Sequence, residues 1–196
     1  MYTANIADTV IFRNLGKHPN PRLQSLKRAV EEAGTEIWVP AAVYHELADT
    51  GSTDSPMNPY LDTAIEEGWL RVATPLPGDR TKGFDRSAGP VEKARFVADE
   101  FLNQQSKYPE TNNWQDAALV ALAVRLFDEN ARIRVITHTA DENLAAACAR
   151  IPPEFGYYDI KSRYYNPPQT AKAEFPTVDR LAWTLLGRGL LVSSQQ

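Results

Sequence analysis

The sequence predicts a three-layer α/β/α fold, in which helices cover both faces of a mostly parallel central sheet. Short runs of β-branched and apolar residues alternate along the chain with longer segments whose apolar residues recur every three to four positions, a pattern typical of α/β domains. The chain has 196 residues, of which 43% are hydrophobic, and a domain of this size buries roughly 70% of the surface of its unfolded chain. We therefore expect one domain, residues 1–150, and a C-terminal extension, residues 151–196, packed on it.

The first half of the chain alternates between predicted strands and predicted helices. The strands are Thr3–Ala7, Glu36–Val39 and Trp69–Val72, and the helices are Pro21–Ala33, Ala41–Asp49 and Tyr60–Glu67. The first helix places Leu23, Leu26 and Val30 on one face. We expect it to end at Gly34 and the second strand to end at Pro40, because glycine and proline commonly terminate such elements.

The second half begins with Thr74–Pro90, a segment rich in proline and glycine whose length predicts a mobile loop beside a functional site. Helices are predicted at Val91–Ser106, Trp114–Glu129 and Glu142–Arg150, and a strand at Ile133–Ile136; the extension adds a strand at Phe155–Ile160 and a helix at Val178–Leu186. Ala117–Val124 is apolar almost all round, so its helix should be the central one.

The composition excludes several classes of protein. Cys148 is the only cysteine, which excludes a disulfide within the chain and a cysteine zinc cluster; its apolar surroundings predict a buried thiol. The sequence contains no secretory signal and no run of about 18 apolar residues, which predicts a soluble, cytoplasmic protein without membrane contact. The net charge of −4 lacks the basic surplus typical of nucleic-acid binders, but it does not exclude one.

Four acidic residues stand where predicted strands end or predicted helices begin. Asp8 directly follows the first strand, and Asp141 follows the strand that ends near Thr137. Glu46 lies one turn into its helix, and Asp116 lies in the first turn of the most apolar helix. Because ligands bind beyond the carboxyl ends of parallel strands, we expect these four side chains to converge at one edge of the sheet.

Carboxylates gathered in this way point to a divalent metal ion. Neighbouring carboxylates repel and raise each other's pKa, and hard cations such as Mg²⁺ or Mn²⁺ remove this repulsion by binding their oxygens. A metal held by such ligands activates water and stabilises charge on phosphate. Each acid alone has a structural explanation, as a turn residue or as an acid favoured at a helix start; the set of four favours a metal site.

The order of these residues resembles that of the PIN-domain family. The four motifs are Asp8-Thr9 after the first strand, Glu46 in a helix that follows a strand and a proline, Asp116 at the start of an alanine-rich helix, and the last motif, Thr139-Ala-Asp-Glu-Asn-Leu144. The resemblance covers about residues 1–150. The sequence departs from the family pattern at Asn143, where the family has a further acid, and the loop around Gly78 and the C-terminal extension exceed the minimal domain.

The resemblance implies a metal-dependent endoribonuclease that cuts RNA with Mg²⁺ or Mn²⁺ and leaves a 5′-phosphate and a 3′-hydroxyl. We expect Asp8 and Asp141 to ligate the main metal, Asp116 to complete its shell, and Glu46 to bind a second metal or orient the attacking water. Thr9, Thr139 and Asn143 are expected to support these ligands. Two roles stay open, a toxin with an antitoxin protein as its partner and an RNA-processing enzyme, and so does the formation of a homodimer.

Contacts to RNA are predicted only weakly. The candidates are Arg13, Lys17 and His18 after the first strand, Arg80, Lys82 and Arg86 in the long loop, His138 near Asp141, and Tyr164 and Tyr165 beside Arg163. The basic residues suit phosphate, and the tyrosines suit stacking on bases. A solvated surface explains the same residues equally well.

Two alternatives to a nuclease follow from particular residues. Asn143 keeps open a catalytically inactive PIN-like module that binds RNA or protein without cutting. A phosphatase of the haloacid-dehalogenase type also begins with a strand and an Asp, but it needs a second Asp two residues later, where this chain has Val10. The chain also contains no His-Glu-x-x-His, Gly-x-Ser-x-Gly or phosphate-binding glycine-rich motif, which excludes several other enzyme classes.

Overall fold

A computed structural model describes most of the predicted domain. It covers residues 2–8, 11–12, 21–49, 59–76, 88–106, 113–130, 132–165, 181–182 and 184–186, with the side chains of residues 21–23, 46–49 and 59–60 left out. Most of the predicted mobile loop Thr74–Pro90 therefore lies outside the described residues.

The centre of the molecule is a five-stranded sheet with all neighbouring strands parallel. Its strands are β1 (Thr3–Ala7), β2 (Ile37–Val39), β3 (Leu70–Val72), β4 (Arg134–Thr139) and β5 (Ile160–Tyr164), in the order β3-β2-β1-β4-β5. The predicted parallel sheet is confirmed. β1 and β4 are neighbours although about 130 residues separate them in the sequence.

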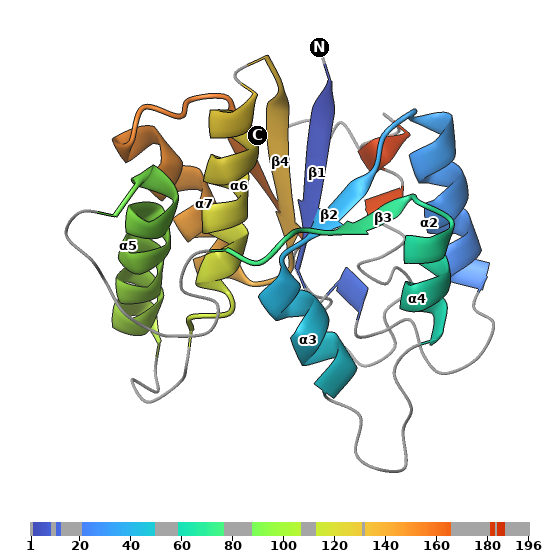
Figure 1. Ribbon diagram of the computed structural model, residues 1–196, viewed down its shortest axis with the longest axis horizontal. Coiled ribbons are helices and arrows are strands. Elements are labelled where there is room, and N and C mark those ends of the chain that lie inside the picture. Colours follow the sequence, from blue (N-terminus) through green and yellow to red (C-terminus); the bar gives the residue numbers. More distant parts are fainter. Residues whose placement is uncertain are drawn as a thin grey trace, which may run out of the picture.

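Helices cover both faces of this sheet, as Figure 1 shows, and the predicted three-layer fold is confirmed. One face carries α5 (Pro90–Gln105), α6 (Ala117–Glu129) and α7 (Glu142–Glu154), and the other carries α2 (Pro21–Glu32) and α4 (Pro59–Glu66); α3 (Ala41–Asp49) starts where β2 ends. Each face has its own apolar cluster. Ala117–Val124 is fully buried, so α6 is the central helix that its all-round apolar surface predicts.

Three predicted boundaries are wrong: the ends of β4 and α7, and the start of α6, which begins at Ala117 and not at Trp114. β4 runs on to Thr139 instead of ending at Ile136, because the polar side chains of Thr137, His138 and Thr139 find hydrogen-bond partners inside the protein. α7 continues to Glu154 instead of Arg150, with two prolines in its last turn. It ends before Gly156, whose φ of 89° favours glycine.

The remaining boundaries concern the C-terminal part. The last strand is Ile160–Tyr164, not Phe155–Ile160, because the first residues of that segment close α7. The expected domain boundary at residue 150 lies within α7. Leu181 and Ala182 are helical and buried against the α2 face of the sheet. Among the described helices, none is both long and apolar enough to cross a membrane.

Candidate active site

The topology of the sheet defines the position where a ligand is expected. β1 and β4 lie side by side, and the chain then continues outward to β2 on one side and to β5 on the other. Ligands of parallel α/β sheets bind at such a switch point, beyond the carboxyl ends of the strands. Asp8 directly follows β1, and Thr139 is the last residue of β4. These two residues therefore lie at the expected position.

Asp8 is a buried carboxylate held by the end of β4. Its side chain is only 2% exposed, and its backbone N–H donates a hydrogen bond to the carbonyl oxygen of His138, at 3.1 Å. The Thr139 hydroxyl donates to Oδ2 of Asp8 at 2.8 Å. The same hydroxyl oxygen accepts a hydrogen bond from the backbone N–H of Asp141, at 3.0 Å. Thr139 thus connects the two ends of β1 and β4 and fixes the orientation of the Asp8 carboxylate.

Asp116 immediately precedes α6 instead of lying in its first turn. It has right-handed helical φ and ψ, and its side chain caps none of the described N–H groups of the helix. The preceding residues from Asn113 form turns, with the Asn113 carbonyl accepting from the N–H of Ala117. Because helical conformation begins before the helix proper, the Asp116 carboxylate is not used as an N-cap.

The thiol of Cys148 is buried on α7. Burial raises the pKa of this thiol to about 12, and the negative charges of Asp8 and Asp116 act in the same direction. Both carboxylates, which stand more than a hundred residues apart in the chain, therefore lie near enough to Cys148 to influence its pKa.

Asp141 has a structural function of its own. Its side chain is exposed, and its Oδ1 accepts a hydrogen bond from the N–H of Leu144 at 2.9 Å, which caps α7. Its backbone is tied to the Asp8 site through Thr139. The structure therefore brings the backbone of Asp141 to the switch point and engages one oxygen of its carboxylate in the cap.

The other predicted site residues are placed less completely. Glu46 belongs to α3, which begins at the carboxyl end of β2 (Figure 1), but its side chain lies outside the description. Asn143 is exposed in the first turn of α7. The candidates outside the described residues are Thr9, Arg13, Lys17, His18, Arg80, Lys82 and Arg86.

His138 does not face a substrate, which corrects the expected contact to phosphate. It is 1% exposed; Nδ1 is 2.7 Å from the Tyr165 hydroxyl, and Nε2 is 3.0 Å from Oδ1 of Asn5. Because Oδ1 of Asn5 is an acceptor, Nε2 carries the proton and Nδ1 accepts from Tyr165. Burial, reinforced by the charge of Arg163, lowers the pKa of His138 to about 3. Tyr165 is likewise buried, whereas Tyr164 is 41% exposed.

The donors at this edge suit a hard divalent cation. The Cys148 thiol stays protonated, and both ring nitrogens of His138 are occupied by protein groups. The remaining atoms that could ligate a metal at this edge are carboxylate oxygens, which Mg²⁺ and Mn²⁺ prefer. Among the described side chains, which include those of Asp8, Asp116 and Asp141, no three of His, Cys, Asp or Glu are close enough to hold a metal ion. A metal held by Asp8 and Asp116 would therefore need a further donor, and Glu46, whose side chain lies outside the description, is the candidate.

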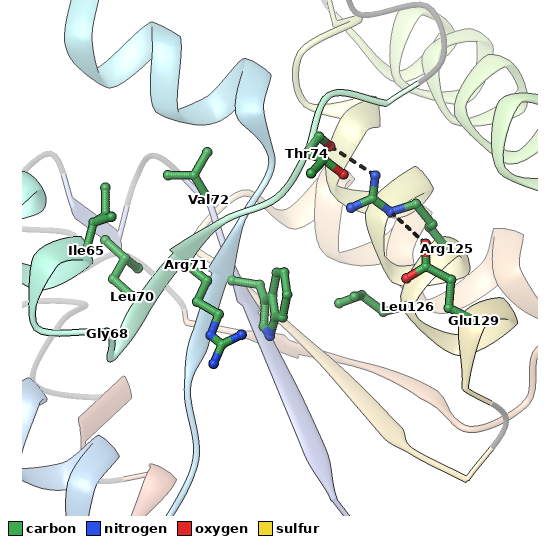
Figure 2. A pocket seen from close by; sticks show the side chains of 10 residues that line it. Ile65, Gly68, Leu70, Arg71, Val72, Thr74, Arg125, Leu126 and Glu129 are labelled. Carbon is green, nitrogen blue, oxygen red and sulfur yellow. Dashed lines mark hydrogen bonds and ion pairs between the residues drawn. The ribbon is translucent and has the colours of Figure 1, made fainter.

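A groove of about 520 Å³ lies elsewhere in the molecule. It is lined by parts of β2, β3, the end of α4 and the second half of α6, and Figure 2 shows Arg125 between Thr74 and Glu129 at its rim. Glu129 follows Asp116 by 13 residues, which corresponds to roughly 20 Å along a helix. This groove is therefore separate from the carboxylates.

Two residues near the site were not predicted from the sequence: Asn5 and Arg95. Asn5 and Tyr165 bond to the two ring nitrogens of His138, and Arg95 is a fully buried arginine on α5. A signal was present for both. Asn5 is a polar residue within a buried strand, and Arg95 stands between Ala94 and Ala98 on the apolar side of its helix.

An all-parallel sheet with carboxylates at its switch point defines an α/β protein with an acidic site. A family model described as Halobacterial PIN domain matches residues 1–168, and the chain therefore belongs to the PIN-domain family, whose members are generally nucleases. A comparison with curated proteins yields no significant match.

Proposed function

We propose that this protein is a metal-dependent endoribonuclease that hydrolyses phosphodiester bonds of RNA with Mg²⁺ or Mn²⁺. One observation carries the proposal: Asp8 is a buried carboxylate fixed by Thr139 at the switch point of a PIN-domain sheet, and its charge and that of Asp116 both raise the pKa of the Cys148 thiol. Two carboxylates at a buried edge repel each other, and a divalent cation is the partner that relieves this repulsion best.

Each residue has a distinct part in this proposal. Asp8 and Asp116 hold the metal, with Glu46 completing its ligands. Thr139 keeps the Asp8 carboxylate in one orientation through the 2.8 Å hydrogen bond to Oδ2, a positioning effect on which metal affinity depends. When bound, the metal supplies the Lewis acidity that lowers the pKa of water and offsets charge on the phosphate.

The geometry at the switch point suits the binding of a phosphate group. α6 and α7 both begin at this edge, and their N-terminal N–H groups favour a phosphate that lies there. In the proposed step, a water oxygen bonds to phosphorus while the bond from phosphorus to the 3′-oxygen breaks. The products are a 5′-phosphate and a 3′-hydroxyl. Arg13, Lys17, Arg80, Lys82 and Arg86 stay proposed contacts to the RNA backbone.

Cleavage of a labelled RNA with Mn²⁺ or with EDTA, followed by analysis of the new ends, tests this proposal. We expect cleavage only with the metal, and 5′-phosphate ends. We also expect Mn²⁺ to raise the melting temperature, because binding to the folded state stabilises it by about 2.7 kcal/mol at a hundredfold excess over Kd. Cleavage that persists in EDTA, or ends with a 2′,3′-cyclic phosphate, would show that the 2′-hydroxyl attacks and that the mechanism is wrong. RNA binding without any cleavage would instead indicate an inactive binding module.

A further inference from the structure

Arg95 is an unusual residue for its position, because it is charged and completely buried. It lies on α5 at 0% exposure, on the side of the helix that also buries Ala94 and Ala98. Arginine keeps its charge in proteins, and a buried charge is tolerated only where other groups compensate for it. A buried arginine on the packing face of a helix is therefore expected to make specific contacts that compensate for its charge.

Arg95 contacts Trp114, in the segment that precedes α6. Its Nε and Nη2 both donate to the carbonyl oxygen of Trp114, at 3.4 and 3.1 Å. Its guanidinium carbon lies 4.3 Å from the centre of the Trp114 ring, which is a close cation–π contact. The Arg95 side chain therefore contacts both the backbone and the ring of Trp114. Lysine has no planar fork with which to repeat this contact.

A second contact ties the same segment to the same helix. The side-chain amide nitrogen of Asn113 donates a hydrogen bond to Oδ1 of Asn103 on α5, at 2.8 Å. The two contacts hold neighbouring residues of the turn Asn113–Asp116, which leads directly into α6. Because the Asp116 side chain caps none of the described N–H groups of α6, the backbone of this turn sets the position from which its carboxylate extends.

We propose that Arg95 is a positioning residue for metal binding: it anchors the turn Asn113–Asp116 on α5 and so holds the Asp116 carboxylate beside Asp8. This inference rests on the proposed function, in which Asp116 is a ligand of the metal. Arg95 acts through Trp114 and does not itself contact the metal or the RNA.

The test compares Arg95→Lys with Arg71→Lys in the full chain. Both changes keep the positive charge, and Arg71 also stacks on a tryptophan, Trp38, at 5.6 Å, but it belongs to β3 and the separate groove. We expect Arg95→Lys to weaken Mn²⁺ binding in calorimetry by about tenfold, the range found for residues that orient metal ligands. We expect kcat to fall similarly with KM for RNA unchanged, and Arg71→Lys to behave as wild type.

Hydrogen exchange provides a readout that needs no metal. The N–H groups of Ala117, Ala118 and Leu119 bond to the carbonyls of the turn, so they should exchange faster in Arg95→Lys than in wild type. If Arg95→Lys does not fold, Asn103→Ala loosens the second contact and should give the same changes with smaller size. Unchanged exchange and unchanged Mn²⁺ affinity in a folded variant would overturn the inference. Faster exchange in a protein whose wild type binds no Mn²⁺ would overturn the proposed function and leave the anchoring of the turn supported.

Discussion

The two ends of α6 lie in regions that handle charge in opposite ways. At its start, the negative charges of Asp8 and Asp116 both raise the pKa of one buried thiol, that of Cys148. At its far end, in the groove, Arg71 pairs with Glu36, and Arg125 bonds to the Thr74 carbonyl at 2.9 Å and lies 3.6 Å from Glu129. The first region therefore contains charges of the same sign, whereas the second contains pairs of opposite sign.

This difference argues against the groove as the candidate for chemistry. The groove offers space, but its charges already lie in partly exposed pairs of opposite sign, and exposed ion pairs contribute little. At the proposed metal site the carboxylates carry like charges, whose proximity becomes favourable only when a cation binds. The following changes test that contrast, beginning with the largest expected effect.

Asp8→Asn should lower metal-dependent RNA cleavage by more than about a hundredfold. Loss of a residue that only orients a ligand costs 10- to 100-fold, and this change removes a ligand's charge. Single-turnover cleavage at saturating Mn²⁺ measures the effect. Asp128→Asn is the matched control, because Asp128 lies exposed at the far end of α6, where it accepts a hydrogen bond from the Tyr157 hydroxyl. Equal activity of the two variants would remove Asp8 from the site.

Thr139→Val should reduce cleavage by about tenfold, because the Asp8 carboxylate loses the hydroxyl that orients it. Thr139→Ser keeps a hydroxyl and should retain most of the activity. The ratio of the two kcat values separates the hydrogen bond from the packing of the buried side chain. If the serine variant is as slow as the valine variant, the hydroxyl has no part in positioning Asp8.

His138 should make the fold less stable at acidic pH. Its folded pKa of about 3 lies below the ordinary value of 6.5, so the unfolded chain binds a proton that the folded chain does not. Stability from the neutral ring is complete above pH 6.5 and falls by up to about 1.4 kcal/mol per pH unit as the pH drops toward 3. Urea unfolding of wild type and His138→Gln measures this. Parallel pH profiles of the two proteins would contradict the buried, neutral histidine.

Arg71→Gln should have the smallest effect. The side chain is 55% exposed in its pair with Glu36, so its loss should change stability by less than about 1 kcal/mol. RNA cleavage should stay within about twofold of wild type, measured under the conditions used for Asp8→Asn. A large loss of activity would mean that the groove takes part in the reaction and that the contrast between the two regions is wrong.

The sequence alone was sufficient to predict the elements and the class of fold. Apolar residues at periods of two and 3.6 are a local property, so β1, α3 and α6 are visible in the chain itself. The order of Asp8, Glu46, Asp116 and Asp141 likewise predicted the family that the comparison confirmed. The predicted boundaries were wrong where polar residues continue a strand, as at Thr137–Thr139, because hydropathy alone does not reveal the hydrogen-bond partners of these residues.

Only the tertiary structure decided which of the candidate residues meet. The hydrogen bond from Thr139 to Asp8 joins residues 131 positions apart, and the order of the strands, which no local pattern contains, brings them together. The same holds for His138, which resembles a surface residue in sequence but lies between Tyr165 and Asn5. It holds for Arg95, whose burial depends on the turn before α6 that packs against it. Local periodicity determines what each segment forms, whereas the packing of distant segments determines which side chains share a site.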